Sequence, residues 1–297
     1  MPDRPVVLLV GRTGQVGGEL LTALDPIARL VAPSHSELDL ADPDAIRRVV
    51  RATRPAVVVN AAAYTAVERA EHDAALCTRI NADAPGILAE ESARIGARII
   101  HYSTDYVFDG TKGSPYVEAD APSPLNVYGR TKLDGERAVV SSRARHLILR
   151  TSWVYGSRGA NFLRTMLRLA EQREEVTVVD DQTGTPTWCR SIARATAQLL
   201  PRLSGSDGDD TSGVFHLTSA GSATWCSFAA AIFAHVARSG AQREVHARPI
   251  STSEFASSVR RPAYSVLDCS RVRERFGIAI PDWREDLPSV LAEIGIV

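Results

Sequence analysis

The residues VVLLVGRTGQVGGELLTAL, at positions 6–24, decide the fold, because they combine a buried strand, a glycine-rich turn and a helix. Val6–Val10 is a continuous apolar run, which is typical of a parallel strand covered on both faces. Gly11, Gly14 and Gly17 follow at three-residue spacing, and the remainder has a helical pattern. Glycines at such a turn leave room for a pyrophosphate, which the helix N-terminus attracts. The stretch predicts the first βα unit of a dinucleotide-binding fold.

Three glycines near a turn are weak evidence alone, and their spacing differs from the G-x-G-x-x-G fingerprint. An ordinary tight turn is the alternative. The surrounding pattern favours the dinucleotide interpretation, because further apolar strands alternate with helices as in a sheet covered on both faces. The strands are expected at 30–32, 57–60, 98–103 and 146–150, and the helices at 42–52, 73–95 and 127–140.

We predict an α/β fold of two parts. A Rossmann-type doubly wound parallel sheet occupies residues 1–155, and a smaller C-terminal substrate-binding domain occupies residues 156–297. Helices are expected in the second part near 161–172, 189–200 and 225–238. Some segments of this part are expected to return to the first sheet.

Composition excludes several classes of function. The 297 residues carry 34 Lys and Arg against 35 Asp and Glu, and this net charge of -1 offers no footprint for nucleic acid. No apolar run reaches the roughly 18 residues that a membrane helix needs. A strand pattern begins at residue 6, so we expect no signal peptide. With four scattered cysteines that read as reduced thiols, we predict a cytoplasmic protein without nucleic-acid or membrane partners.

The region after the second strand bears on the choice of nicotinamide. An acidic residue there would bind the ribose 2′-hydroxyl of NADH, but Ser34 stands in a stretch without a carboxylate until Glu37. Arg12, in the glycine-rich turn, suits a 2′-phosphate. Both features favour NADPH over NADH. The alternatives are that Arg12 is a solvated loop cation and that Asp39 contacts the adenine end.

Tyr128 and Lys132 form a Y-x-x-x-K pair, and residues four apart share one helix face. An ammonium near a phenol favours the phenolate and lowers the tyrosine pKa, so Tyr128 suits a general acid to a ketone oxygen. Chance often yields this spacing, and a surface tyrosine beside a solvated lysine is the alternative. Thr104 strengthens the catalytic interpretation, because it ends a strand at the carboxyl edge of the sheet, where ligands bind. Its hydroxyl would be a second donor to the same oxygen.

Eight segments in this order resemble the extended short-chain dehydrogenase/reductase family and, within it, the dTDP-4-dehydrorhamnose reductases. They are GRTGQVG (11–17), RPAVVVNAAAYTAVERAE (54–71), IIHYSTDYVFDG (99–110), PLNVYGRTKLDGE (124–136), RTSWVYG (150–156), NFLRTMLRLA (161–170), DDQTGTPT (180–187) and RRPAYSVLD (260–268). The resemblance implies NADPH-dependent reduction of the C4 ketone of dTDP-4-dehydro-β-L-rhamnose to dTDP-β-L-rhamnose.

The resemblance also implies roles for individual residues. Tyr128 donates the proton, Lys132 tunes it and holds the nicotinamide ribose, and Thr104 polarises the ketone. The dTDP-sugar is expected to contact Thr104, Asp105, Trp153, Arg260 and Arg261. The expected cofactor-binding residues are Gly11, Arg12, Thr13, Gly14, Gln15, Val16, Gly17, Ser34, Asp39, Leu40, Ala62, Ala63, Tyr64, Thr65, Tyr128 and Lys132.

Two of the substrate assignments have ordinary structural alternatives. Trp153 offers an apolar face to a deoxysugar, and core packing is its alternative. The Arg260 and Arg261 guanidinium groups suit a pyrophosphate, and the alternative is that the two residues simply form a surface turn before Pro262.

A metal site is doubtful. The resemblance implies that some members bind Mg²⁺ through glutamates at a dimer interface, and Glu19 and Glu293 stand at matching places. Arg190 replaces a further glutamate, so we expect no intact Mg²⁺ site, and the associated homodimer stays open. Two other functions stay open as well: reduction of another dTDP-4-keto-6-deoxysugar in antibiotic or glycan biosynthesis, and a non-catalytic regulatory subunit, which the intact Tyr128 and Lys132 disfavour.

Overall fold

A computed structural model describes residues 4–203, 211–240 and 245–296 of the chain. Its main sheet is parallel throughout, in the order β10-β5-β4-β3-β1-β2. The strands are β1 (Val6–Val10), β2 (Arg29–Val31), β3 (Val57–Asn60), β4 (Arg98–Thr104), β5 (Arg145–Thr151) and β10 (Gly213–His216). The chain order reverses between β1 and β3, and open α/β sheets bind ligands at such a switch point. The predicted doubly wound fold is confirmed.

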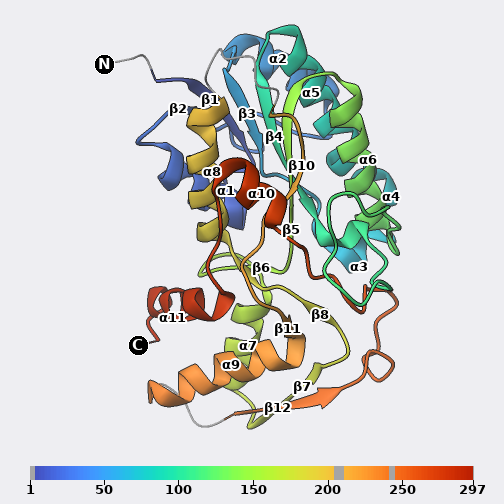
Figure 1. Ribbon diagram of the computed structural model, residues 1–297, viewed down its shortest axis with the longest axis vertical. Helices are drawn as coiled ribbons and strands as arrows, with labels where there is room; N and C mark the ends of the chain where they lie inside the picture. The colour runs from blue at the N-terminus through green and yellow to red at the C-terminus, as the bar shows by residue number, and fades with distance from the viewer. Residues whose placement is uncertain (1–3, 204–210, 241–244, 297) are drawn as a thin grey trace.

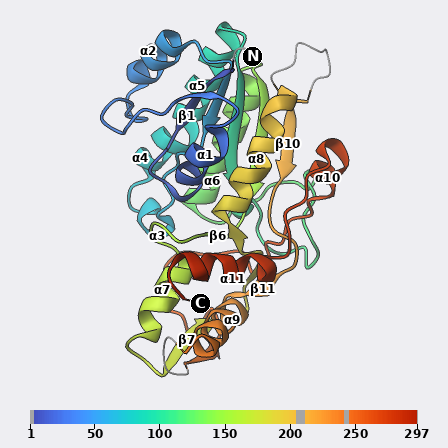
Figure 2. The ribbon, with the colours of Figure 1, turned by 90° about the vertical axis from the view of Figure 1, so that its left-hand side faces the viewer.

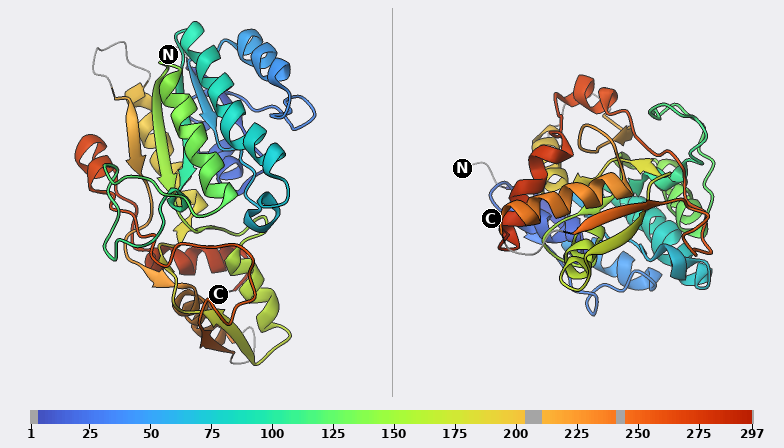
Figure 3. Two further views of the ribbon diagram at one scale, coloured as in Figure 1. Left: turned by 90° about the vertical axis from the view of Figure 1, so that its right-hand side faces the viewer. Right: turned by 90° about the horizontal axis from the view of Figure 1, so that it is seen from below.

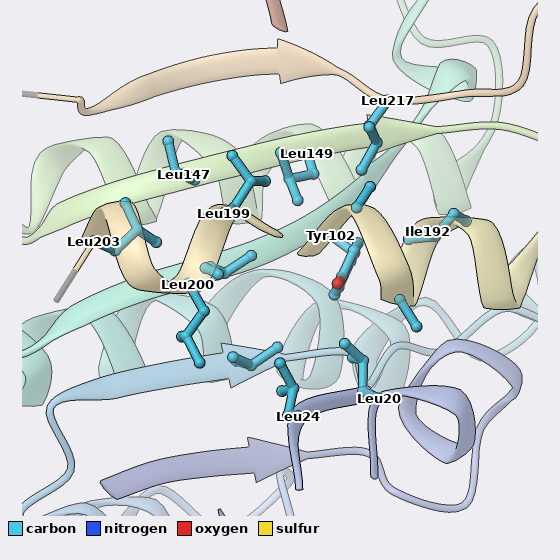
Figure 4. Close-up of a cluster of buried hydrophobic side chains, with 14 of the residues drawn as sticks. Leu20, Leu24, Tyr102, Leu147, Leu149, Ile192, Leu199, Leu200, Leu203 and Leu217 are labelled. Atoms are coloured by element: carbon cyan, nitrogen blue, oxygen red, sulfur yellow. The ribbon is translucent and has the colours of Figure 1, made fainter. Parts of the chain in front are cut away.

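Helices cover both faces of the sheet (Figures 1 and 2). One face packs against α1 (Gln15–Leu24), α8 (Cys189–Leu203) and α10 (Ser270–Phe276), and the other against α2 (Pro43–Thr53), α5 (Ala84–Arg94) and α6 (Val127–Ser141). Figure 4 shows leucines of α8 lying between the sheet and α1. This burial of apolar surface on two faces explains why the strands read as unbroken apolar runs.

A smaller lobe lies below the carboxyl edge of the sheet (Figures 1 and 3). Its core joins aromatic and aliphatic side chains of three helices to a parallel pair of strands. These are α7 (Phe162–Ala170), α9 (Trp225–Arg238), α11 (Trp283–Glu293), β7 (Glu175–Val179) and β12 (His246–Ile250). Two short pairs connect the lobes: β6 (Val154–Tyr155) with β9 (Thr187–Trp188), and β8 (Thr183–Gly184) with β11 (Ala223–Thr224).

The later half of the chain is divided between the two cores. Both α8 and β10 pack with the main sheet, whereas α7, α9 and α11 form the smaller lobe. A domain boundary after residue 155 stays a prediction. Within the described ranges, no helix is long and apolar enough to cross a bilayer.

The helical stretch expected over much of 73–95 is present but is divided by a wide turn. The structure has α4 (Ala74–Thr78), a π-helical turn η1 (Arg79–Asp83) and then α5, after the short α3 (Val67–Ala70). Pro85 has no N–H to pair with the carbonyl of Asn81, which interrupts the regular ladder. That carbonyl lies against Gly135 of α6, where a side chain would overlap it. The π-helical turn therefore packs closely against α6 at Gly135.

Candidate active site

A cavity of about 580 Å³ lies at the carboxyl ends of β1, β3 and β4. Most of the predicted cofactor-binding residues line it: Gly11, Arg12, Thr13, Gly14, Gln15, Val16, Ser34, Asp39, Leu40, Ala62, Ala63, Thr65, Tyr128 and Lys132. Gly17 and Tyr64 are not among the lining residues. Gly17 packs beneath Gly11, and the main chain of Tyr64 is hydrogen-bonded to Asn81.

The three glycines of the turn after β1 have different roles. Gly11 has a φ of +91°, and a Cβ there would lie 2.6 Å from the Ala62 nitrogen. A Cβ on Gly17 would overlap the Gly11 carbonyl oxygen. A Cβ on Gly14, however, would meet only that oxygen, at 3.4 Å, which is ordinary contact. Gly11 and Gly17 are needed by the chain itself, whereas Gly14 leaves space for a bound phosphate group at the N-terminus of α1.

Changing Gly14 to alanine is expected to weaken nicotinamide binding about ten-fold or more without lowering stability, because the added methyl fills the space facing the cavity and not the protein core. Fluorescence titration with NADPH and thermal unfolding would measure the two effects. Gly17→Ala is the matched control and should unfold at markedly lower temperature. A Gly14→Ala variant that loses both stability and binding would contradict this division of roles.

The N-terminus of α6 presents Tyr128 at the cavity. The Asn126 side chain accepts a hydrogen bond from the Gly129 nitrogen, and Glu71 accepts one from the Val127 nitrogen. Both contacts satisfy amides that the first helical turn leaves unpaired. The Thr104 side chain lies close enough to the Tyr128 hydroxyl to lower its pKa. The predicted pair of hydroxyl groups at the strand end is therefore brought together.

Lys132 lies one turn further along α6, is 2 % exposed and donates to the Tyr102 carbonyl at 2.6 Å. Burial lowers the pKa of Lys132 to about 8. The predicted lowering of the tyrosine pKa is wrong for this structure: burial raises the pKa of Tyr128 above its ordinary value, which outweighs the lowering by Thr104. Because the phenol keeps its proton at neutral pH, it suits an acid better than a base.

On the substrate side, Asp105 is buried and accepts hydrogen bonds from Ser265 at 2.6 Å and Thr104 at 3.1 Å. Burial raises the pKa of Asp105 to about 7. Trp153 has a φ of +42°, unusual for a non-glycine residue, and its ring stacks on Trp225 with centroids 3.4 Å apart. Trp153 itself is not among the cavity-lining residues, whereas its neighbour Val154 is, so its contact with a sugar stays a prediction.

The two arginines before Pro262 differ. Arg260 is exposed, and its carbonyl accepts from Asn126 at 2.9 Å. Arg261 forms an ion pair with Glu68 and lies near Tyr106, and both raise its pKa. Its Nε is buried without a hydrogen-bond partner among the described residues. One donor of Arg261 is therefore without a protein partner in the described part of the chain and could serve an anionic ligand. That Arg260 and Arg261 together bind the substrate pyrophosphate stays a prediction.

The two glutamates considered for Mg²⁺ do not fit a metal. Arg190 forms ion pairs with both Glu19 and Glu293, and Arg158 lies 3.4 Å from Glu19. A guanidinium thus fills the space between the two carboxylates and neutralises them. The doubt raised by Arg190 in the sequence has this physical basis.

The structure adds residues that sequence reasoning missed. Asn81, in the π-helical turn, bonds the main chain of Tyr64 and the hydroxyl of Thr131, which joins the cavity wall to α6. Gly159 and Ala160 line the cavity from beyond the expected domain boundary. Thr151 does so as well, and its hydroxyl has no partner in the described structure. Of these features, only the π-helical turn had a signal in the sequence: Pro85 lies four residues after Asn81 and cannot donate to its carbonyl.

Comparison with known proteins agrees with this geometry. A family model described as RmlD substrate binding domain matches residues 5–296. The chain is similar to a dTDP-4-dehydrorhamnose reductase of Burkholderia thailandensis, with 50% identity over 94% of this chain and 95% of the relative, and to one of Escherichia coli, with 42% identity over 97% of each. A crystal structure of dTDP-4-dehydrorhamnose reductase from Bacillus anthracis in complex with NADP superposes with a TM-score of 0.89 at 33% identity, covering 98% of this chain and 99% of that chain.

Proposed function

Because the chain belongs to the dTDP-4-dehydrorhamnose reductase family, we propose that it reduces the C4 ketone of dTDP-4-dehydro-β-L-rhamnose to dTDP-β-L-rhamnose with NADPH. The observation that carries the proposal is the meeting of Tyr128, Thr104 and Lys132 beside a dinucleotide-sized cavity. NADPH fits this cavity, since Gly14 leaves room for a phosphate and the Thr151 hydroxyl lacks a protein partner. When bound, NADPH supplies the hydride.

The residues of the chain then divide the remaining chemistry. The Tyr128 phenol gives its proton to the ketone oxygen, and the Thr104 hydroxyl donates a hydrogen bond to that oxygen as negative charge develops on it. Lys132, buried in the cavity wall, is suited to hold the sugar of the nucleotide by hydrogen bonds. Arg12 is suited to a 2′-phosphate at the adenine end of the cavity, whereas the Ser34 hydroxyl and amide both donate to the Glu37 carboxylate.

The sugar and its nucleotide need separate contacts. Asp105 and Trp153 flank the place where the hexose would lie, with Trp153 offering an apolar face to a 6-deoxy carbon. Arg260 and the free Nε–H of Arg261 are suited to the pyrophosphate. These contacts would select a nucleotide-linked deoxysugar over a free one.

The test is a substrate panel. The purified protein is incubated with NADPH or NADH and with dTDP-4-dehydro-β-L-rhamnose or other dTDP-4-keto-6-deoxysugars, while the nicotinamide absorbance is followed. We expect the highest kcat/KM with the rhamnose precursor and NADPH. We also expect the configuration at C4 of the product, read by NMR, to match that of dTDP-β-L-rhamnose. Faster reduction of another keto-sugar, or no reduction of any, would reject the proposal.

A further inference from the structure

Behind the cavity, two buried polar side chains that the reaction described above does not use lead to Lys132. Asn60 on β3 lies 3.1 Å from His101 on β4, measured from amide Nδ2 to ring Nδ1. On the other side of the ring, Nε2 lies 3.4 Å from the Lys132 Nζ. Asn60 and His101 are fully buried. Polar groups this deep are held in one arrangement by their partners.

The partners fix which ring nitrogen of His101 carries the proton. The Asn60 Oδ1 accepts from the Ala62 nitrogen at 3.2 Å. If the side-chain amide were flipped, its NH2 group would face the Ala62 N–H, and two donors would oppose each other. The amide nitrogen therefore faces His101, and it can only donate. The ring Nδ1 must be the acceptor, which leaves the hydrogen on Nε2. Burial and the neighbouring Lys132 lower the pKa of His101 well below its ordinary value, so the ring is neutral.

This tautomer points an N–H at Lys132. An ammonium has three donors and no lone pair, so it opposes the Nε2–H across 3.4 Å. A neutral amine has a lone pair that faces Nε2–H, while it still donates to the Tyr102 carbonyl. The contact thus favours the uncharged form of Lys132.

The use of basic residues in the chain supports a need for an amine here. The sequence has 32 arginines and two lysines, Lys112 and Lys132. Lys112 is partly exposed and forms an ion pair with Asp120. Arginine stays charged in proteins, whereas lysine loses its proton readily when buried. In this arginine-rich chain, Lys132 is therefore a buried basic residue whose charge can change.

We infer that Asn60 and His101 are positioning residues: they hold the Lys132 Nζ between a ring N–H and the Tyr102 carbonyl, in an arrangement that favours the uncharged form of Lys132. This inference rests on the proposed function, to which it adds two buried side chains that do not line the cavity.

Other ionisable groups surround Lys132 and bear on its titration. Glu136, one turn along α6, favours the ammonium, but its carboxylate is paired with Arg150. Cys77, from α4, is a buried thiol whose pKa is raised by burial, so it is neutral at pH 7. The Tyr128 phenol is also neutral at that pH. None of these groups supplies a fixed, unpaired anion against the amine.

The experiment reads both residues by NMR, with no substrate present. In protein labelled with ¹⁵N-histidine, His101, identified by its loss in His101→Phe, is expected to show the Nε2–H tautomer; the Nδ1–H tautomer would overturn the inference. In protein labelled with ¹³C-lysine at Cε, the Lys132 signal is assigned in Lys112→Arg, which removes the other lysine. We expect the Lys132 midpoint to lie at least 1 pH unit below the ordinary lysine value of about 10.4, and a midpoint at that value would also overturn the inference.

Asn60→Asp is the decisive variant, because a carboxylate of the same shape accepts from ring Nδ1 and moves the hydrogen away from Lys132. The Lys132 midpoint is expected to rise by about 1 pH unit, and the alkaline limb of kcat to follow it. The added negative charge alone is measured by Asn60→Asp in a His101→Phe background. An equal rise in both backgrounds would show that charge and not the tautomer acts. Loss of ketone reduction with these titrations unchanged would count against the proposed function instead.

Discussion

Phenylalanine in place of Tyr128 is expected to lower kcat for ketone reduction by about 10²- to 10⁴-fold, because the general acid is lost while the ring remains. The affinity for NADPH is expected to change less than three-fold, since most of the cavity wall is supplied by residues 10–16, by residues between 33 and 40, and by residues 61–63. Steady-state kinetics would give kcat and KM, and fluorescence titration the affinity.

The matched control is Tyr155→Phe. Tyr155 is also a buried tyrosine, but it packs in the smaller lobe with its hydroxyl 3.4 Å from the Trp283 carbonyl. Removing that hydroxyl should leave kcat within about two-fold of the original. If Tyr128→Phe keeps full activity, or if both variants lose activity equally, Tyr128 is not the proton donor.

The raised pKa of Tyr128 sharpens the same prediction. Burial keeps the phenol protonated across neutral pH, so the reduction rate should not increase as pH rises toward the ordinary tyrosine value. The Y-x-x-x-K spacing alone predicts the opposite shift, because it contains the lysine charge but not the desolvation of the phenol. Three residues at and just after the end of β4 also act on the phenol: Thr104 lowers its pKa, and Asp105 and Tyr106 raise it.

What the sequence predicted well was local. The apolar run at Val6–Val10, the glycines after it and the helix expected at 42–52 rest on short-range signals, and each lies where expected. The π-helical turn was missed because a helical apolar pattern spans it, although Pro85 disrupts its hydrogen bonds. Such a turn is stabilised by contacts of Asn81 with Tyr64 and Thr131, which are distant in sequence.

The site shows the same limit. Residues of the glycine turn were identified from their spacing, and resemblance carried the prediction to Asp39 and Ala62, which line the cavity. His101 was not identified, because an isolated histidine in an apolar strand has no pattern. Its meaning comes from Asn60 on one side and Lys132 on the other, and only the register of β3 against β4 brings them together.

The largest loss of stability is expected from breaking the ion pair of Arg150 on β5 with Glu136 on α6. Both side chains are 4 % exposed, and the guanidinium makes two parallel hydrogen bonds, at 2.9 and 2.7 Å. Arg150→Met would leave a buried carboxylate with only Ser103 as donor. We expect the free energy of unfolding to fall by about 3–5 kcal/mol, measured by urea denaturation.

Glu136→Met should lower the free energy of unfolding by a similar amount, because it leaves the buried Arg150 guanidinium without its carboxylate partner. The double variant is the sharper measurement: with both charges gone, two apolar side chains of similar length can pack between β5 and α6, so most of the loss is expected to be regained. An exposed pair on the same helix, Asp134 with Arg137, serves as the control, and its loss should cost less than about 1 kcal/mol. If the double variant is destabilised by the sum of the single effects, the pair contributes through packing and not through its buried charge. Because α6 also carries Tyr128 and Lys132, the single variants should lose activity at temperatures where the double variant keeps it.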